Sequence, residues 1–432
     1  MQRINNGQNH ISESAGFNFN IDPGGIFRLG ENADWTTLTT GNSNFNFSNN
    51  GEFLEHYSNT LSNTADITSG INQYDPNLDV DVSQIQHIFG ASHIAGWYNF
   101  TDDPFLIEGL DKYEEFGATS IKTTLTPRNG RMESAYPFNH NWPNFSDLQS
   151  VAEHEYIDSL FQRTHVKTHT FWTTTKNQGV YKQGPDFNHE FFLSQEEEFY
   201  DLTFYLLDTY GDMDKSFIYQ NWEGDWMLRG EGNNWENNPS VIPDDVEWMI
   251  EGMSRMFRAR QRGVERAREQ FQDATAKVMH AIEFNKLWTL SNGQRITMME
   301  NNTPSVLGNV IPSTRIDLSS WSAYDASWSN GNNPHGHAMW KGIEIAKYFT
   351  NKTGMIPNET PVQIGEFAIN ENPPYNGNNT QNEIENAVLV TKSLNFDVAM
   401  TPSLIKKFGG KALSVNVVRN PLATCEGWVR RG

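Results

Sequence analysis

The sequence predicts an α/β fold, specifically a (β/α)8 TIM barrel, and two observations indicate it. From about Gln84 onward, short apolar runs alternate with amphipathic helical stretches along most of the chain. Strands that alternate with helices usually pair in parallel, because each helix returns the chain to the same end of the sheet. A chain of 432 residues is also long enough for one barrel of ordinary size.

The expected strands are apolar runs that are bounded by turn residues. Seven of them follow from the sequence: residues 85–94, 118–125, 165–174, 216–221, 277–284, 316–324 and 361–367. A closed barrel needs an eighth strand, and the candidate for it is residues 412–418. Two alternatives follow: this run closes the barrel after an insertion, or the barrel is imperfectly closed.

The expected helices lie between these strands. Their apolar residues recur at helical spacing over about 105–116, 148–161, 195–209, 243–271, 337–349 and 383–394. We expect Gly117 to end the first helix, Ser194 to cap the third, and Pro243 to lie in the first turn of the fourth.

Composition divides the chain into three segments. Residues 1–82 are rich in Asn, Ser, Thr and Gly without a sustained helical period, and we expect loops, short strands or a partly mobile arm there. Residues 83–396 hold the barrel. Residues 397–432 carry six Lys or Arg and two acidic residues, which reverses the charge balance of the rest of the chain.

Charge and composition restrict the expected partners. A formal net charge of -21 repels the phosphates of nucleic acid. The Arg-rich stretch from Arg255 to Arg268 is interleaved with Glu265, which is typical of a solvated helix face. No apolar run suggests a membrane span or a signal peptide, and the oligomeric state and the compartment, secretion included, stay open. A neutral partner such as a carbohydrate fits this composition better.

Two glutamates stand where barrel enzymes place their reacting groups, just beyond apolar strands. The expected fourth strand continues into Asn221-Trp222-Glu223-Gly224, and the expected seventh strand ends in Gly365-Glu366. Cleavage of a glycosidic bond needs two carboxyl groups that face one linkage, one to protonate the departing oxygen and one to attack the anomeric carbon. Glu223 and Glu366 are therefore the candidate catalytic pair, with Asp225 as a rival for either role.

These positions resemble the clan of retaining (β/α)8 glycoside hydrolases that includes cellulases, mannanases and β-galactosidases. That clan carries its acid/base glutamate after strand four and its nucleophile after strand seven, and the resemblance spans about Gln84 to Leu394. It implies hydrolysis of β-linked poly- or oligosaccharides through a covalent glycosyl-enzyme intermediate, with Glu223 as acid/base and Glu366 as nucleophile. In the clan an Asn directly precedes the acid/base, whereas here Trp222 separates Asn221 from Glu223. A Tyr near strand six often orients the nucleophile, and Tyr324 is the nearest candidate.

Seven residues are candidates for substrate binding. Several are aromatic rings near expected strand ends, where they could stack on the apolar faces of sugars. The set is Asn221, Trp172, Trp222, Trp226, Trp321, Tyr324 and His337.

We expect no cofactor and no catalytic metal. His335 and His337 could serve as ligands, but no third ligand with suitable spacing accompanies them, and the single Cys425 excludes a multi-cysteine site. Two other functions stay open: a non-catalytic carbohydrate-binding barrel, and a metal-dependent barrel hydrolase.

Overall fold

The structure is a computed structural model, and part of the chain can be described. The described residues are 2–4, 26–28, 89–94, 99–115, 118–182, 186–229, 235–327, 342–343, 345–346, 349–350, 362–366 and 415–417. The expected helix over 383–394, the pair His335 and His337, Gly117, and nearly all of residues 1–82 lie outside them. Only β1 (Gln2–Ile4) and β2 (Ile26–Arg28), which pair antiparallel, are described in that first segment.

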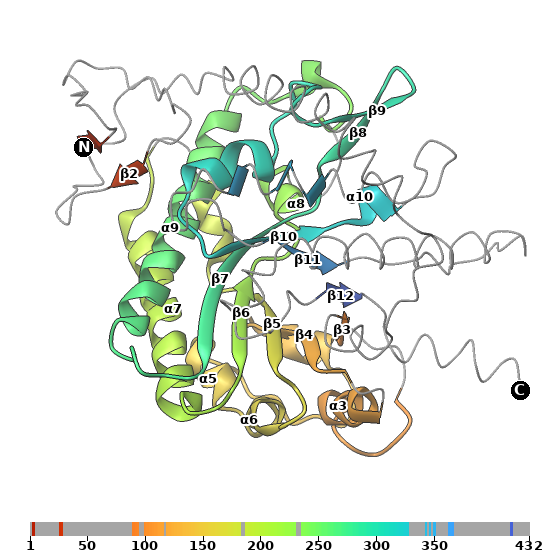
Figure 1. Cartoon of the computed structure of the whole chain (residues 1–432), viewed down its shortest axis with the longest axis vertical. Helices are drawn as coiled ribbons and strands as arrows, with labels where there is room; N and C mark the ends of the chain where they lie inside the picture. The colour runs from red at the N-terminus through yellow and green to blue at the C-terminus, as the bar shows by residue number, and fades with distance from the viewer. Residues whose placement is uncertain are drawn as a thin grey trace, which may run out of the picture.

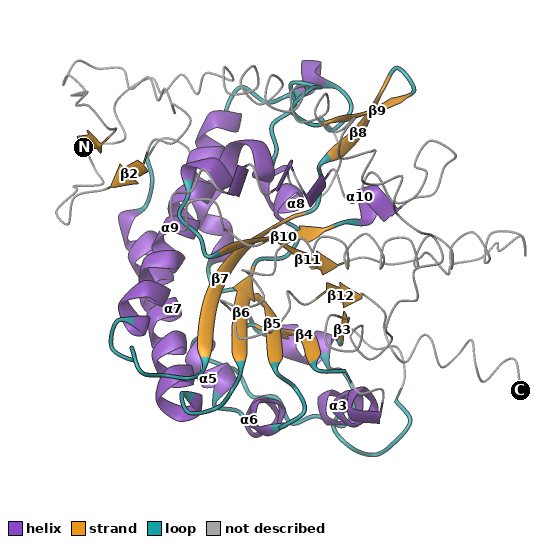
Figure 2. Cartoon of the chain, in the orientation of Figure 1, coloured by secondary structure: helices purple, strands orange, loops and turns teal. Residues whose placement is uncertain are grey.

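A curled parallel sheet lies at the centre of the fold, with helices on its outer side (Figure 1, Figure 2). Every neighbouring pair of strands in it is parallel. In spatial order the strands are β12 (Val415–Val417), β3 (Phe89–Ser92), β4 (Ser120–Leu125), β5 (Thr168–Thr173), β6 (Ser216–Gln220), β7 (Lys277–Phe284), β10 (Leu318–Ser322) and β11 (Val362–Glu366).

The seven strands expected between residues 85 and 367 are all present, so the α/β class is confirmed. β12 lies within the run over 412–418 and pairs with β3 at one edge of the sheet. The two edge strands, β11 and β12, are neighbours in space. Within the described residues, however, no backbone pairing joins them. As far as the structure describes it, the curled sheet therefore has no hydrogen bonds between its edge strands β11 and β12.

The helices and one small hairpin connect these strands. The helices whose bounds fall within the described residues are α3 (Phe105–Glu115), α4 (Arg131–Ala135), α5 (Leu148–Ala152), α6 (Glu155–Gln162), η2 (Gln178–Lys182), α7 (His189–Tyr210), α8 (Gly224–Arg229), η3 (Pro239–Val241), α9 (Val246–Arg268), η4 (Val306–Val310), η5 (Ile311–Ser313) and α10 (Tyr324–Ser327). β8 (Trp288–Ser291) and β9 (Gln294–Thr297) form an antiparallel hairpin. None of the helices described is long and apolar enough to cross a membrane.

The start of α7 differs from the expectation. The helix begins at His189 rather than near residue 195, and its cap is Asn188, whose Oδ1 accepts the backbone N–H of Phe191 at 3.3 Å. Ser194 lies inside the helix and donates to the Phe191 carbonyl at 2.8 Å. Phe191 and Phe192 in the first turn are buried in the core, so the helix begins earlier than a Ser194 cap predicts. The expected helix over 148–161 is likewise two helices, α5 and α6.

Side chains on the strands alternate between the helix layer and the inside of the curled sheet. Outward-facing rings such as Phe171, Phe217 and Phe284 join two large hydrophobic clusters beneath the helices. The inside holds a small apolar cluster of Ile218, Ala281 and Leu318. Polar side chains also face inward, including a hydrogen bond from Ser320 Oγ to Gln220 Oε1 at 2.8 Å. A polar, hydrogen-bonded interior can support charged groups at the sheet's end.

Candidate active site

Glu223 and Glu366 lie at the carboxyl-side ends of two strands of the curled sheet. Glu223 is in the turn between β6 and α8, and Glu366 is the last residue of β11. The negative charge of Glu366 is among the causes that raise the pKa of Glu223. The fold therefore brings the two glutamates, distant in sequence, within electrostatic reach of each other.

Glu366 is held at both carboxylate oxygens. Lys122 Nζ pairs with Oε1, and the Tyr324 hydroxyl donates to Oε2 at 3.0 Å. Burial and the charge of Glu366 raise the pKa of Tyr324, which keeps its hydroxyl a donor. Tyr324, expected near the nucleophile from the resemblance, does contact Glu366. Two donors on two oxygens fix the orientation of the carboxylate.

Glu223 is a half-buried carboxyl with an unusual backbone. Its φ is 23°, in the left-handed region that non-glycine residues rarely adopt. Burial raises its pKa to about 8, and the negative charges of Glu283 and Glu366 add to this effect against the opposing charges of Lys122 and Lys286. Near neutral pH this carboxyl holds its proton, as a general acid requires.

Glu283 and Lys122 complete the cluster, and sequence reasoning missed both. Lys122 lies inside β4 and Glu283 near the end of β7, and both side chains are almost fully buried. Lys122 Nζ donates to Glu283 Oε1 at 3.1 Å and also pairs with Glu366. Each charge lies within a run expected as a buried strand, 118–125 or 277–284, which is the signal that could have identified it, because an unpaired charge in a buried strand would be costly.

The charged cluster explains the ionisation of its members. Burial raises the pKa of Glu283, while Lys122 opposes the rise. Burial alone would lower the pKa of Lys122, but the two carboxylates raise it, so the ammonium stays charged. The site thus combines three carboxyl groups with one buried cation.

Two glycines permit close packing around the site, Gly224 at the start of α8 and Gly365 in β11. A Cβ on Gly224 would lie 2.3 Å from the Glu283 carbonyl oxygen, and one on Gly365 would lie 2.1 Å from Ser320 Oγ. The pairing of β10 with β11 shifts register at this point, so that Ser322 stands opposite Glu366. Such irregularities commonly redirect a side chain beside an active site.

Asn221 and Asp225 have structural contacts in place of the roles expected for them. Asn221 bridges β6 to β7, since its Nδ2 donates to the Glu283 carbonyl at 2.9 Å and its Oδ1 accepts the Glu283 N–H at 2.8 Å. Asp225 is fully buried and accepts backbone N–H groups from Asn285, Lys286 and Val306. Neither side chain is left free for a substrate.

The candidate aromatic residues separate into two groups. Trp172, Trp222 and Trp226 are partly exposed, and the rings of Trp172 and Trp222 lie 5.7 Å apart at an angle of 32°. Trp321 is fully buried and stacks on Phe284 within the helix-side core, so it does not line a cleft. The alternation of faces along β10 explains this, because Trp321 is the neighbour of inward-facing Ser320 and Ser322.

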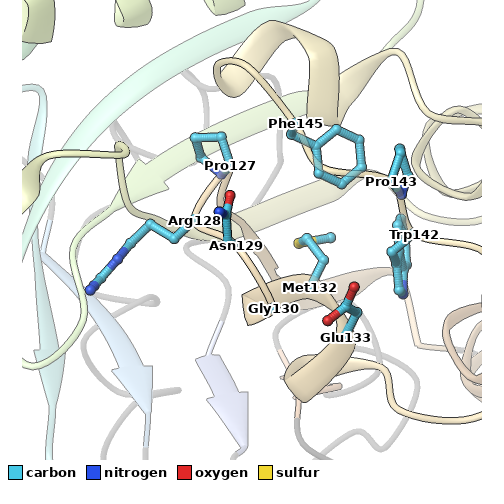
Figure 3. Close-up of a pocket in the computed structure, with 9 residues that line it drawn as sticks. All are labelled: Pro127, Arg128, Asn129, Gly130, Met132, Glu133, Trp142, Pro143 and Phe145. Carbon is cyan, nitrogen blue, oxygen red and sulfur yellow. The ribbon is translucent and has the colours of Figure 1, made fainter.

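A small pocket lies on the loop that follows β4 (Figure 3). Met132, Trp142, Pro143 and Phe145 gather around it, whereas Arg128 extends away from them. Trp142 and Phe145 are each 7% exposed, so this loop packs on its own side chains. None of its lining residues is among the partners of Glu223 or Glu366 described above.

Comparisons with known proteins do not assign the chain. No model of a known protein family matches it, and no curated protein sequence matches it. In the part of the chain that the structure describes, no group of three or more His, Cys, Asp or Glu side chains is arranged to hold a metal ion.

Proposed function

We propose that this chain is a retaining glycoside hydrolase that cleaves β-linked poly- or oligosaccharides, with Glu223 as general acid/base and Glu366 as nucleophile. The proposal rests on one observation: both glutamates belong to the same charged cluster, at the carboxyl-side ends of parallel strands. Reacting groups in α/β barrels occupy this end of the sheet.

The contrast between the two carboxyl groups supports the assignment of roles. Glu223, with a pKa raised to about 8 by burial, can protonate the departing glycosidic oxygen. Glu366, oriented by Lys122 and Tyr324, can attack the anomeric carbon. Water then attacks the glycosyl-enzyme bond while Glu223 takes the proton, which restores both groups. The partly exposed Trp172, Trp222 and Trp226 would stack on sugar rings.

We also propose that the sheet is a complete (β/α)8 barrel whose eighth strand is β12. The parallel pairing of β12 with β3 and its position beside β11 support this closure. A closed barrel would surround the interior cluster of Ile218, Ala281 and Leu318 on all sides.

The proposal is tested by measuring hydrolysis of a panel of β-linked polysaccharides and aryl β-glycosides by the purified protein. Glu366→Gln should abolish hydrolysis, and Glu223→Gln should reduce it by about 10²- to 10⁴-fold, less on substrates with good leaving groups. The matched control is Glu198→Gln on α7, because burial also raises the pKa of Glu198, to about 7, outside this site.

Two outcomes would reject the proposal. Binding of a polysaccharide without hydrolysis of any substrate would indicate a carbohydrate-binding barrel. Loss of activity with a chelator, together with survival of activity in Glu366→Gln, would indicate a metal-dependent hydrolase.

A further inference from the structure

Glu283 contacts the surroundings of both candidate catalytic glutamates. Its Oε2 accepts the backbone N–H of Glu223 at 3.1 Å, and its Oε1 accepts Lys122 Nζ at 3.1 Å and Ser322 Oγ at 2.9 Å. The side chain is fully buried, so it does not touch solvent. Its carboxylate therefore links the end of β6 to β4 and β10.

We propose that Glu283 is a positioning residue that sets the placement of Glu223 and Glu366 relative to each other. This inference rests on the proposed glycosidase function and deepens it. Glu283 would act through backbone and Lys122 contacts, without touching the substrate.

The contact with Glu223 stabilises a strained turn. A non-glycine residue in a sparsely populated backbone region costs of order 1–3 kcal/mol and persists only when its surroundings hold it. At Glu223, where φ is 23°, the carboxylate of Glu283 accepts the backbone N–H directly. Asn221 binds the main chain of Glu283 through two further hydrogen bonds. Side chain and main chain of Glu283 thus both anchor this turn.

The contact with Glu366 runs through Lys122. The ammonium is shared between Glu283 and Glu366, so Glu283 determines where it lies. A buried cation with only one carboxylate partner could move fully onto that partner. Because the ammonium of Lys122 pairs with both carboxylates, it stays between β7 and β11. There it fixes the position of Glu366 Oε1.

Glu283 also contributes to the charge around Glu223. The groups that act on Glu223 are Glu283 and Glu366, which raise its pKa, and Lys122 and Lys286, which lower it. Tyr324 faces the same group of carboxylates. Neutralising Glu283 removes one of the raising charges, so the pKa of Glu223 should fall.

The test is Glu283→Gln in the full chain, with Glu198→Gln as control. Both carboxylate oxygens of Glu283 accept hydrogen bonds, whereas an amide offers one oxygen and one NH2 donor. One of the two links must therefore break, whichever way the amide turns. We expect kcat to fall about 100-fold through misplacement of the catalytic groups, with KM little changed, and the basic limb of the pH profile to move to lower pH.

A readout independent of activity is the backbone amide proton of Glu223, followed by NMR with ¹⁵N-labelled glutamate. In the wild type, the hydrogen bond to Glu283 Oε2 should move this resonance downfield. In Glu283→Gln that downfield displacement should be lost. A folded variant with wild-type kcat and an unmoved basic limb would overturn the inference. If Glu283→Gln does not fold, Ser322→Ala removes one donor to Glu283 and should lower kcat with KM unchanged, and an unchanged kcat would overturn it.

These results separate the two proposals. Absence of hydrolysis by the wild type would reject the glycosidase function, and with it a positioning role in catalysis. The Glu223 amide resonance would still report whether Glu283 holds that turn.

Discussion

Glu223 carries the ionisation on which the proposed chemistry depends. Its acid form is present below a pKa of about 8, and it is lost as the pH rises through that value. We therefore predict that kcat/KM has a basic limb near pH 8. In Glu223→Gln, measured on an aryl glycoside with a good leaving group, that limb should vanish. Persistence of the limb in this variant would assign it to another group.

Lys122 is the single buried cation shared by Glu283 and Glu366. Removing one partner of a buried ion pair typically costs about 3–5 kcal/mol, so Lys122→Met should lower the free energy of unfolding by a similar amount near pH 8. Lys122 lowers the pKa of Glu283. In the variant that pKa should lie further above its unfolded value, so the lost stability should return in part as the pH falls.

Urea denaturation at pH 6 and pH 8 measures this dependence. The control is Lys112→Met, because Lys112 forms an exposed pair with Glu115 on α3. Equal destabilisation by the two variants would contradict the role assigned to Lys122.

Sequence reasoning reached the two candidate catalytic residues and, through the resemblance, Tyr324, but it missed Lys122 and Glu283. Glu223 and Glu366 follow apolar runs, which is a local signal. The contact between Lys122 and Glu366 joins β4 to β11, and no local pattern encodes such a pairing. Trp321 was misassigned to the cleft because a ring near a strand end can face either side, and the register of β10 decides which.

At the scale of elements, Gly224, the first residue of α8, has no space for a side chain. A Cβ there would lie 2.3 Å from the Glu283 carbonyl oxygen, which is backbone and cannot move aside cheaply. Gly224→Ala should cost about 1–3 kcal/mol of stability through overpacking and should displace Glu223. Thermal unfolding and kcat together measure the effect.

Gly179→Ala is the matched control for this prediction, since no atom lies within 4 Å of a Cβ at Gly179. Unchanged stability and activity in Gly224→Ala would show that the turn can rearrange freely.

Strands were predicted more accurately than helices for a physical reason. A buried parallel strand is often apolar over most of its length, so its limits are visible, as in β7, whose bounds match the expected range 277–284. The Asn188 cap starts α7 at His189, before the position that a Ser194 cap predicts, because either polar residue can cap a helix. The edge strand β12 is short and follows a basic segment, which obscured its role.

For the whole molecule, we predict that buried histidines lower the stability of the fold at acid pH. His169 is fully buried between Phe171 and Phe217, and burial lowers its pKa well below the ordinary value. Burial lowers the pKa of His93 in the same way, to about 4. A neutral buried histidine favours the fold above about pH 6.5, and stability falls below that pH by up to about 1.4 kcal/mol per pH unit for each such group.

His169→Phe should therefore raise the free energy of unfolding at pH 5.5 more than at pH 7.5. In the described part of the chain neither ring nitrogen of His169 has a hydrogen-bond partner, so the substitution removes no visible bond. The exposed His140, replaced by Phe, is the control. An equal change at both pH values would refute this origin of acid sensitivity.

The covalent intermediate offers the most direct test of the central claim that Glu223 and Glu366 act together on one sugar linkage. The protein would be incubated with a set of 2-deoxy-2-fluoro-β-glycosyl fluorides of different sugars, and the labelled peptide identified by mass spectrometry. The mechanism predicts a label on Glu366, formed by wild type and absent in Glu366→Gln. A label on Glu223 or Glu283, or hydrolysis with an inverted anomer as first product, would contradict it.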